Sequence, residues 1–136
     1  MFVDLDKFKS VNDQYGHHIG DLLLKYVADR IIGTLRRSDS AARFGGDEFI
    51  ILLLSVKKEK NALIVAEKIR HVLGQPFEIA GLTLQISASI GVTLYPSHAD
   101  TEYELMKRAD IAMYYAKAEG RNCVKVYHKT MLEQSS

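Results

Sequence analysis

Apolar residues recur at helical spacing in three segments of the chain. Between residues 19 and 35 they stand four apart, which predicts an amphipathic helix because such side chains share one face: Ile19, Leu23, Val27, Ile31 and Leu35. A second helix is predicted over about 61–73, with Gly74 as its C-cap. A third begins at a capping box, Thr101 with Glu104, and ends near Gly120. Its apolar stripe comprises Leu105, Ala109, Ala112, Met113 and Ala116.

Shorter apolar runs between these segments predict β-strands. The chain opens with MFVDL, and the runs SAARF and EFIILLL flank Gly45–Gly46, which predicts a hairpin with a primed turn. PFEIAG predicts a short strand, LTLQISASIGVTLYP a long one, and CVKVY the last. The order of strand, helix, hairpin, helix, strands, helix and strand predicts an α/β (α+β) sandwich, with helices over a largely antiparallel central sheet.

Composition places the chain among ordinary globular domains. Its 136 residues are enough for about one domain, and they are 47% hydrophobic and 26% charged. A net charge of +1 gives no broad basic surface, so we expect no nucleic-acid partner and no membrane contact by this segment. No apolar run approaches the roughly 20 residues that span a bilayer. The single cysteine, Cys123, has no partner for an internal disulfide, which favours a cytoplasmic location.

The first candidate site lies in VDLDKFKSVND, residues 3–13. Asp4 and Asp6 are two residues apart, so on a strand both carboxylates project from one face. Hard oxygen ligands of this kind suit Mg²⁺. An EF-hand calcium loop does not fit, because Lys9 stands where that loop requires glycine. The alternative is a solvated acidic end of a strand.

The second candidate is the hairpin RFGGDEF, residues 43–49. Glycine lets a substrate approach the backbone closely, and the two acids Asp47 and Glu48 stand directly before an apolar run. If Asp4 and Asp47 end on neighbouring strands, they form a two-carboxylate metal site. Strand alternation predicts opposite faces for Asp47 and Glu48. The alternative is an ordinary Gly-Gly turn with solubilising acids.

Two further groups have the chemistry of nucleotide recognition. The Asp21 carboxylate can accept the N1–H and N2–H₂ of guanine, while the Asn12 amide can donate to O6. In the first turn of a helix Asp21 would also favour the helix dipole without any ligand. Lys117 and Arg121, four apart at a helix end, suggest a triphosphate clamp, or alternatively C-capping by basic residues. No P-loop motif is present.

Four segments together resemble one family. DLDKFKSVNDQYGHHIGD, RFGGDEF, SIGVTLYP and ADIAMYYAKAEGRN are similar, in this order and spacing, to the GGDEF family of diguanylate cyclases over residues 1–127. Residues 128–136 are then a tail or the start of a linker. The resemblance implies a palm-like, ferredoxin-like-derived fold as in nucleotidyl cyclases. It also implies an Mg²⁺-dependent enzyme (Mn²⁺ being an alternative) that condenses two GTP into cyclic di-GMP and pyrophosphate across a homodimer.

The resemblance also implies a role for each matching residue. The metal ligands would be Asp4, Asp47 and the main-chain oxygen of Leu5, and Glu48 would be needed for activity. The residues implied to bind substrate are Asn12, Asp21, Gly45, Gly46, Lys117 and Arg121. Lys9 would stabilise the transition state. Arg36 and Asp39, in RRSD, match the family's R-x-x-D site for inhibition by the product cyclic di-GMP, and their alternative is helix-end charge followed by an Asp turn.

One family feature is missing from the match. The helix with a D-x-L-T-x-L-x-N-R signature that usually precedes the first strand is not found in these residues, so we expect apolar surface of the sheet to be uncovered. A second functional hypothesis therefore accompanies the first. It is a non-catalytic GGDEF module that binds GTP or cyclic di-GMP and regulates a partner or an EAL domain.

Overall fold

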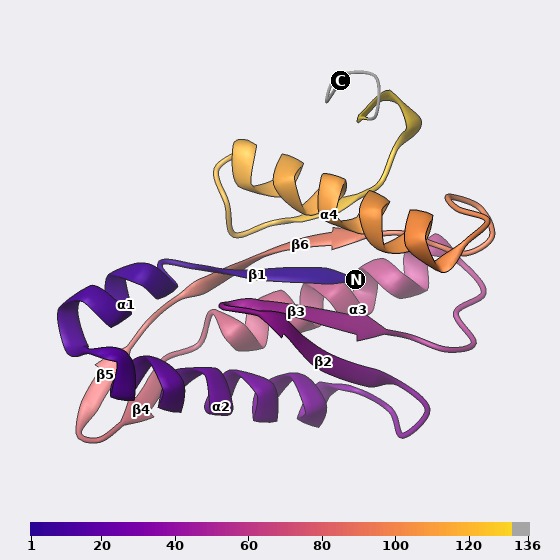
Figure 1. Cartoon of the computed structure of the whole chain (residues 1–136). Coiled ribbons are helices and arrows are strands. Elements are labelled where there is room, and N and C mark those ends of the chain that lie inside the picture. The colour runs from indigo at the N-terminus through magenta and orange to yellow at the C-terminus, as the bar shows by residue number, and fades with distance from the viewer. Residues whose placement is uncertain (132–136) are drawn as a thin grey trace.

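The computed structural model describes residues 1–131 of the chain. The predicted tail at 128–136 lies partly outside the described residues, and the predicted domain boundary near residue 127 stays a prediction. None of the helices in residues 1–131 combines the length and apolar character needed to cross a bilayer. In chain order the elements of Figure 1 are β1 (Phe2–Asp6), α1 (Phe8–Tyr15), α2 (His17–Thr34), β2 (Ser40–Gly45), β3 (Glu48–Leu52), α3 (Glu59–Leu73), β4 (Phe77–Ile79), β5 (Leu82–Leu84), β6 (Ser87–Val92), α4 (Glu102–Ala118) and β7 (Val124–Val126).

Five strands form one sheet, in the order β2-β3-β1-β6-β7. The central strand β1 pairs antiparallel with β3 on one side and with β6 on the other. β2 and β3 form an antiparallel hairpin, and β6 and β7 pair in parallel. β4 and β5 form a separate two-stranded ribbon. The predicted fold class, a mostly antiparallel central sheet flanked by helices, is confirmed.

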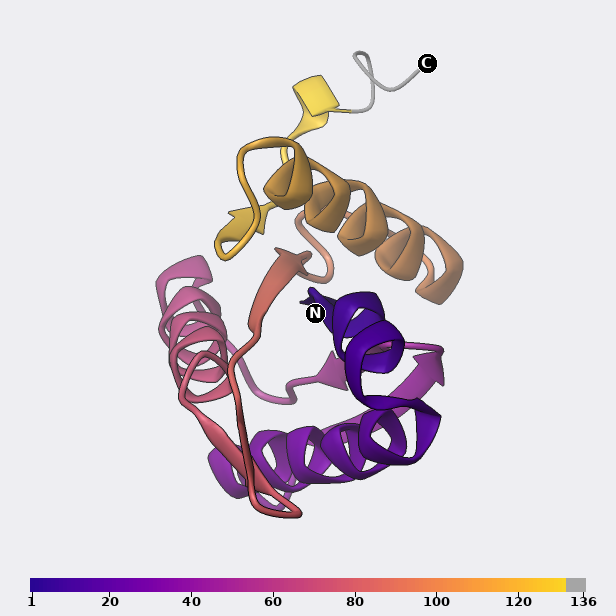
Figure 2. The same ribbon diagram turned by 90° about the vertical axis from the view of Figure 1, so that its left-hand side faces the viewer.

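Helices cover both faces of this sheet, as Figures 1 and 2 show. α2 and α3 pack against each other on one face, α4 lies on the other over β6, β1 and β7, and α1 packs against α2. The main core lies between the sheet and the α2–α3 pair, where Ile51, Ile69 and Ile90 are almost fully buried. The helical stripe predicted over 19–35 faces this core, since Leu23, Val27 and Ile31 are buried.

Arg30 on α2 joins that helix to the end of α3. Its guanidinium donates hydrogen bonds to the carbonyls of Val72 and Gln75, both at 2.8 Å, and of Pro76 at 2.5 Å. The same group lies 3.5 Å from the centroid of the Phe77 ring. Of these carbonyls Val72 belongs to the last turn of α3, and Gln75 and Pro76 belong to the segment that leads to β4, so one cation ties this turn to α2 and stacks on an aromatic face.

α4 approaches β6 more closely than a side chain at Gly91 would permit. A Cβ at this position would lie 2.1 Å from the carbonyl oxygen of Ala109 and 2.3 Å from the amide nitrogen of Met113. The apolar stripe predicted for this helix is confirmed by the burial of Ala109, Ala112, Met113 and Ala116. The predicted cap is confirmed as well, because the Thr101 hydroxyl accepts a hydrogen bond from the backbone N–H of Glu104 at 3.1 Å.

Three local predictions are wrong. Residues 8–15 form α1, which the sequence pattern did not predict because only Phe8 and Val11 of this short helix are buried. α2 begins at His17 rather than Ile19, so Asp21 lies in its second turn, where the helix dipole is weaker. The long strand predicted over 82–96 is two strands, because residues 82–84 pair with β4 and residues 87–92 join the central sheet.

An apolar groove of about 600 Å³ runs beside α4, between that helix and the ends of β3 and β6. Its lining includes Leu52, Leu54 and Tyr95, whose exposed fractions are 48%, 50% and 68%. Side chains of this size are usually covered in a folded domain. Leu52 belongs to β3, whereas Leu54 and Tyr95 lie in the loops after β3 and β6, so the expectation that apolar surface of the sheet is uncovered stays a prediction.

Candidate active site

Asp6 at the end of β1 is a buried carboxylate with a full set of partners. It accepts hydrogen bonds from the hydroxyls of Ser87 at 2.6 Å and Ser89 at 2.8 Å, and from the backbone N–H of Asn122 at 3.1 Å. These bonds satisfy both carboxylate oxygens. Asp6 thereby joins the centre of the sheet to the segment that follows α4, which is a structural role.

Asp4, two residues earlier on the same strand, has a different environment. It is 4% exposed, and its Oδ2 forms an ion pair with the ammonium of Lys117 on α4. Its Oδ1 is buried and has no hydrogen-bond partner. A buried polar atom left unpaired costs on the order of 1–3 kcal/mol. This oxygen is thus a buried acceptor that no side chain of residues 1–131 satisfies.

The β2–β3 hairpin brings the two acids of the GGDEF sequence beside Asp4. Its turn consists of Gly46 and Asp47, one residue later than predicted, and Gly46 has a φ of +45°, which favours glycine. The backbone N–H of Leu5 donates to the carbonyl of Asp47 at 3.1 Å, and Glu48 is the cross-strand neighbour of Asp4. Because Asp47 lies in the turn, the strand alternation that predicted opposite faces for the two acids does not apply.

Negative charge accumulates at this end of the sheet. Burial raises the pKa of Asp4, the Lys117 ammonium bonded to it lowers it, and the charge of Asp47 raises it again, so that the net shift is upward. Burial raises the pKa of Glu48 as well, and the charge of Asp4 adds to that shift. A cation bound among these carboxylates would favour their charged forms.

Asp110 on α4 belongs to the same group, although the sequence did not lead us to predict it. Burial raises its pKa while Lys117 lowers it, and its charge raises the pKa of Glu48. Asp110 precedes Lys117 by seven residues, which is two helical turns, so both lie on one face of α4. The seven-residue spacing between Asp110 and Lys117 could have indicated from the sequence that Asp110 belongs to the site. We call Asp4, Asp47, Glu48 and Asp110 the acidic cluster.

The acidic cluster offers carboxylate oxygens of the kind that divalent metal ions take as ligands in proteins. Within residues 1–131, no three side chains of His, Cys, Asp or Glu are arranged to hold a metal ion by themselves. The unpaired Asp4 oxygen lies beside the turn that carries Asp47, and Leu5, whose main-chain oxygen is the third predicted ligand, is buried next to Asp4. Mg²⁺ characteristically takes one or two carboxylates and fills its remaining positions with water and substrate phosphate.

The three predicted cations lie in different surroundings. Lys117 is already paired with Asp4, so it reaches the acidic cluster. Arg121 is exposed beyond the end of α4, where its backbone has a left-handed φ of +64°. Lys9 is exposed in the first turn of α1. The structure therefore brings one of these cations to the carboxylates and leaves the other two at the surface.

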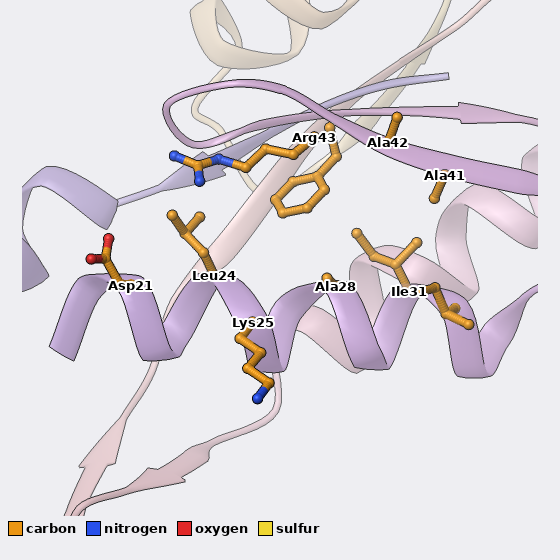
Figure 3. A pocket seen from close by; sticks show the side chains of 10 residues that line it. Asp21, Leu24, Lys25, Ala28, Ile31, Ala41, Ala42 and Arg43 are labelled. Carbon is orange, nitrogen blue, oxygen red and sulfur yellow. The ribbon is translucent and has the colours of Figure 1, made fainter. Parts of the chain in front are cut away.

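The predicted guanine readers come from two helices that pack together. Asn12 on α1 is partly buried, whereas Asp21 on α2 is exposed and lines a groove of about 280 Å³ between α2 and the β2–β3 hairpin. Figure 3 shows Asp21 and the Arg43 guanidinium at the same end of this groove. The Nε of Arg43 donates to the carbonyl of Gly46 at 2.8 Å, so this side chain is tied to the hairpin turn. Gly45, the other predicted glycine, is the last residue of β2.

Arg36 and Asp39 shape the turn between α2 and β2. One oxygen of the Asp39 carboxylate accepts the backbone N–H of Arg36 at 3.0 Å, and the other accepts that of Leu54 at 3.2 Å. The alternative of an Asp turn thus accounts for both oxygens of Asp39. The Arg36 residue is exposed, which leaves its guanidinium open to a ligand.

Comparison with known proteins agrees with this geometry. The family model described as "Diguanylate cyclase, GGDEF domain" matches residues 1–123. The chain is 49% identical over 131 residues to the bifunctional diguanylate cyclase/cyclic di-GMP phosphodiesterase MucR of Pseudomonas aeruginosa, which is 96% of this chain and 19% of MucR. The chain thus spans about a fifth of the length of this curated relative.

Two solved structures have the same fold. The crystal structure of the GGDEF domain of TpbB (YfiN) from Pseudomonas aeruginosa gives a TM-score of 0.91 at 43% identity, covering 93% of this chain and 80% of that chain. The GGDEF domain of DgcB from Caulobacter crescentus, solved in complex with c-di-GMP, gives 0.82 at 30% identity, covering 92% and 66%.

Proposed function

The chain belongs to the GGDEF family of diguanylate cyclase domains, and we propose that it condenses two molecules of GTP into cyclic di-GMP and pyrophosphate. One observation carries the proposal. The buried, unpaired oxygen belongs to Asp4, which lies beside the hairpin turn that holds Asp47 and opposite Glu48 on β3, where carboxylates crowd without enough positive charge. The name of the relative MucR, which includes diguanylate cyclase, supports the same reaction.

Asp4, Asp47 and the main-chain oxygen of Leu5 are the proposed ligands of Mg²⁺ or Mn²⁺. When bound, such an ion supplies positive charge at the reacting phosphate and favours the ionised form of the attacking hydroxyl. Phosphoryl transfer needs mainly positioning and charge compensation from the protein. The acidic cluster suits that task because its carboxylates already repel one another in the structure.

Lys117 has a proposed second partner. In the structure it neutralises Asp4. When nucleotide enters, Lys117 exchanges the Asp4 carboxylate for oxygens of the triphosphate, and Arg121 binds the same group from the surface turn after α4. Lys9 compensates charge that develops on the transferred phosphate. Each cation thus acts on the phosphates by charge and hydrogen bonding.

Asn12 and Asp21 read the guanine base in this proposal. The Asn12 amide donates to O6, and the Asp21 carboxylate accepts N1–H and N2–H₂, a pattern that adenine reverses. Each chain holds one GTP, and two chains face each other as a homodimer. In each of two steps a 3′-oxygen forms a bond to the α-phosphorus of the other nucleotide, the bond from that phosphorus to the bridging oxygen breaks, and pyrophosphate leaves.

Arg36 is proposed to bind the product and inhibit the enzyme, with Asp39 holding the turn that presents it. The exposed guanidinium can grip a phosphate of cyclic di-GMP through two parallel hydrogen bonds. The complex of the DgcB domain with c-di-GMP shows that a GGDEF domain of this fold binds that nucleotide. Each oxygen of the Asp39 carboxylate accepts one backbone N–H and has capacity for a second hydrogen bond from a guanine edge.

A second candidate function is a regulatory module that binds GTP or cyclic di-GMP without turnover. Another relative favours it, because the chain is also 40% identical over 136 residues to the cyclic di-GMP phosphodiesterase NbdA of Pseudomonas aeruginosa, which is 100% of this chain and 17% of NbdA, and that name includes no cyclase activity. In such a protein the nucleotide would change the activity of the neighbouring domain. The acidic cluster would then hold a nucleotide and its ion but would not need to activate a hydroxyl.

One experiment separates these functions. The purified chain is incubated with GTP and Mg²⁺ at concentrations that allow dimers, and the nucleotides are separated by chromatography. Cyclic di-GMP with pyrophosphate supports the cyclase, and unchanged GTP contradicts it. Asp47→Ala is expected to abolish turnover with an unaltered circular dichroism spectrum. Asp29→Ala, which removes an exposed acid of α2, is the matched control and should retain full activity.

A further inference from the structure

Gly20 on α2 is packed directly against α1. It is buried, and a Cβ built at this position would lie 1.7 Å from Oδ1 of Asn12 and 2.9 Å from its Cγ. The next nearest atom, Cζ of Phe8, would lie at 3.3 Å. Gly33 on the same helix has nothing within 4 Å of such a Cβ. The close approach is thus particular to residue 20, and the atoms that it brings together are those of a predicted guanine reader.

The side chain of Asn12 is held in one orientation by this contact. Its Oδ1 is buried without a hydrogen-bond partner, whereas its Nδ2 is not among the buried unpaired atoms of residues 1–131. Both atoms are bonded to Cγ and diverge from it. With Oδ1 nearer than Cγ to the Cβ position of Gly20, the amino group is directed away from that residue. Because an unpaired buried oxygen is unfavourable, the packing of α1 against Gly20 has to keep Oδ1 in this position.

We propose that Gly20 is a positioning residue for guanine recognition, which rests on the proposed function. The absent side chain leaves a space that the carboxamide oxygen of Asn12 occupies, so the amino group stays outside as the donor that O6 of guanine requires. Asp21 is the next residue along α2, and its carboxylate accepts the N1–H and N2–H₂ groups of the same base. Gly20 and Asp21 thereby place both groups that read the base. Asp21 itself is the acceptor, and Gly20 positions the donor, which is the amino group of Asn12.

The test compares Gly20→Ala with Gly33→Ala, which introduces the same methyl group into the same helix without a contact. The probes are GDP and inosine diphosphate, which lacks the N2 amino group, and binding is measured by titration calorimetry. Wild type should prefer GDP. Gly20→Ala should weaken both nucleotides about tenfold, because one base contact is lost. The ratio of the two affinities should stay unchanged, because Asp21 still reads the N2 group. Gly33→Ala should bind like wild type.

The measurements distinguish a failure of the proposed guanine recognition from a failure of the proposed role of Gly20. If wild type does not prefer GDP over inosine diphosphate, the proposed guanine reading fails. If wild type prefers GDP and Gly20→Ala binds like Gly33→Ala, the positioning role of Gly20 is overturned. A changed ratio in Gly20→Ala would also overturn it, because the substitution would then act on Asp21.

A second comparison, in the Asn12→Ala variant, tests the proposal if Gly20→Ala alone does not fold. Asn12→Ala removes Oδ1 and Cγ, the two atoms closest to the new methyl group. Adding Gly20→Ala to Asn12→Ala should therefore restore a cooperative unfolding transition and cause no further loss of GDP affinity. A double variant that stays unfolded, or that loses affinity beyond Asn12→Ala, would overturn the proposal, because Gly20 would then act through another neighbour.

Discussion

Lys117→Met tests how the acidic cluster is held in the absence of a ligand. The substitution keeps a long unbranched side chain on α4 but removes the ammonium that pairs with Oδ2 of Asp4. Asp4 is 4% exposed and its other oxygen already lacks a partner. The variant therefore leaves a buried carboxylate with neither of its oxygens paired by the protein.

The expected loss of unfolding free energy is bounded from above. Removing one partner of a buried ion pair typically lowers the free energy of unfolding by about 3–5 kcal/mol. The folded variant can instead protonate Asp4, whose ordinary pKa is 3.8. Protonating such a group at pH 7 costs about 4 kcal/mol, at roughly 1.36 kcal/mol per pH unit. We expect a loss of about 2–4 kcal/mol at pH 7, because Lys117 is 30% exposed and its charge is partly screened already.

The loss should depend on pH with a definite sign. Lys117 lowers the pKa values of Asp4, Glu48 and Asp110, so its removal raises all three in the folded chain. A carboxyl group whose pKa is higher in the folded than in the unfolded chain weakens the fold at pH values above its unfolded pKa. The difference between wild type and Lys117→Met is thus largest near pH 7 and shrinks as the pH falls through the raised folded pKa values toward 3.8.

The assay is urea unfolding of both proteins at intervals between pH 4.5 and pH 7.5. Lys125→Met is the control, because it breaks the ion pair between Lys125 and Glu119, whose exposed fractions are 31% and 55%. An exposed pair of this kind contributes about 1 kcal/mol or less. A loss in Lys117→Met that is no larger than in the control, or that does not change with pH, would refute the reasoning.

Four further substitutions test other contacts of the fold and the site. Gly91→Ala should lower the unfolding free energy by more than about 2 kcal/mol in urea titrations, because its methyl group meets backbone atoms of α4, and a loss under 0.5 kcal/mol would show that the helix moves freely. Arg30→Met should cost about 2–4 kcal/mol, since three carbonyls lose a charged donor, and a melting temperature equal to that of wild type would contradict this. Arg36→Ala should relieve inhibition by cyclic di-GMP without changing the urea midpoint, and an unchanged inhibition curve would remove the assignment. Asp39→Ala should cost about 1–2 kcal/mol, because two backbone N–H groups lose their acceptor, and an unaltered midpoint would count against that role.

Long amphipathic elements were predictable because their burial repeats many times. α2 contains four of the five apolar residues predicted at one spacing, with Leu35 at its C-cap, and in α4 both the apolar stripe and the Thr101 cap were found. α1 was not predicted because a helix of eight residues with two buried side chains shows too little apolar periodicity. The division between β5 and β6 was hidden because both strands are apolar, and their pairing with different partners depends on distant residues. Periodicity therefore predicts which face of an element is buried but not which element covers it.

The same limit applies to the candidate site, and β1 shows why. Asp4 and Asp6 are chemically identical and two residues apart, so a sequence pattern assigns them the same role. The structure separates them through partners that are distant in the chain, since Asp6 is satisfied by residues 81, 83 and 116 positions away. Asp4 meets only Lys117 and keeps one oxygen unpaired. The distinction between a carboxylate satisfied by the fold and one with an unpaired oxygen thus arises when β6 and α4 pack against β1, and Asp6→Asn should lower the free energy of unfolding in urea titrations by weakening bonds that Asp4 does not make.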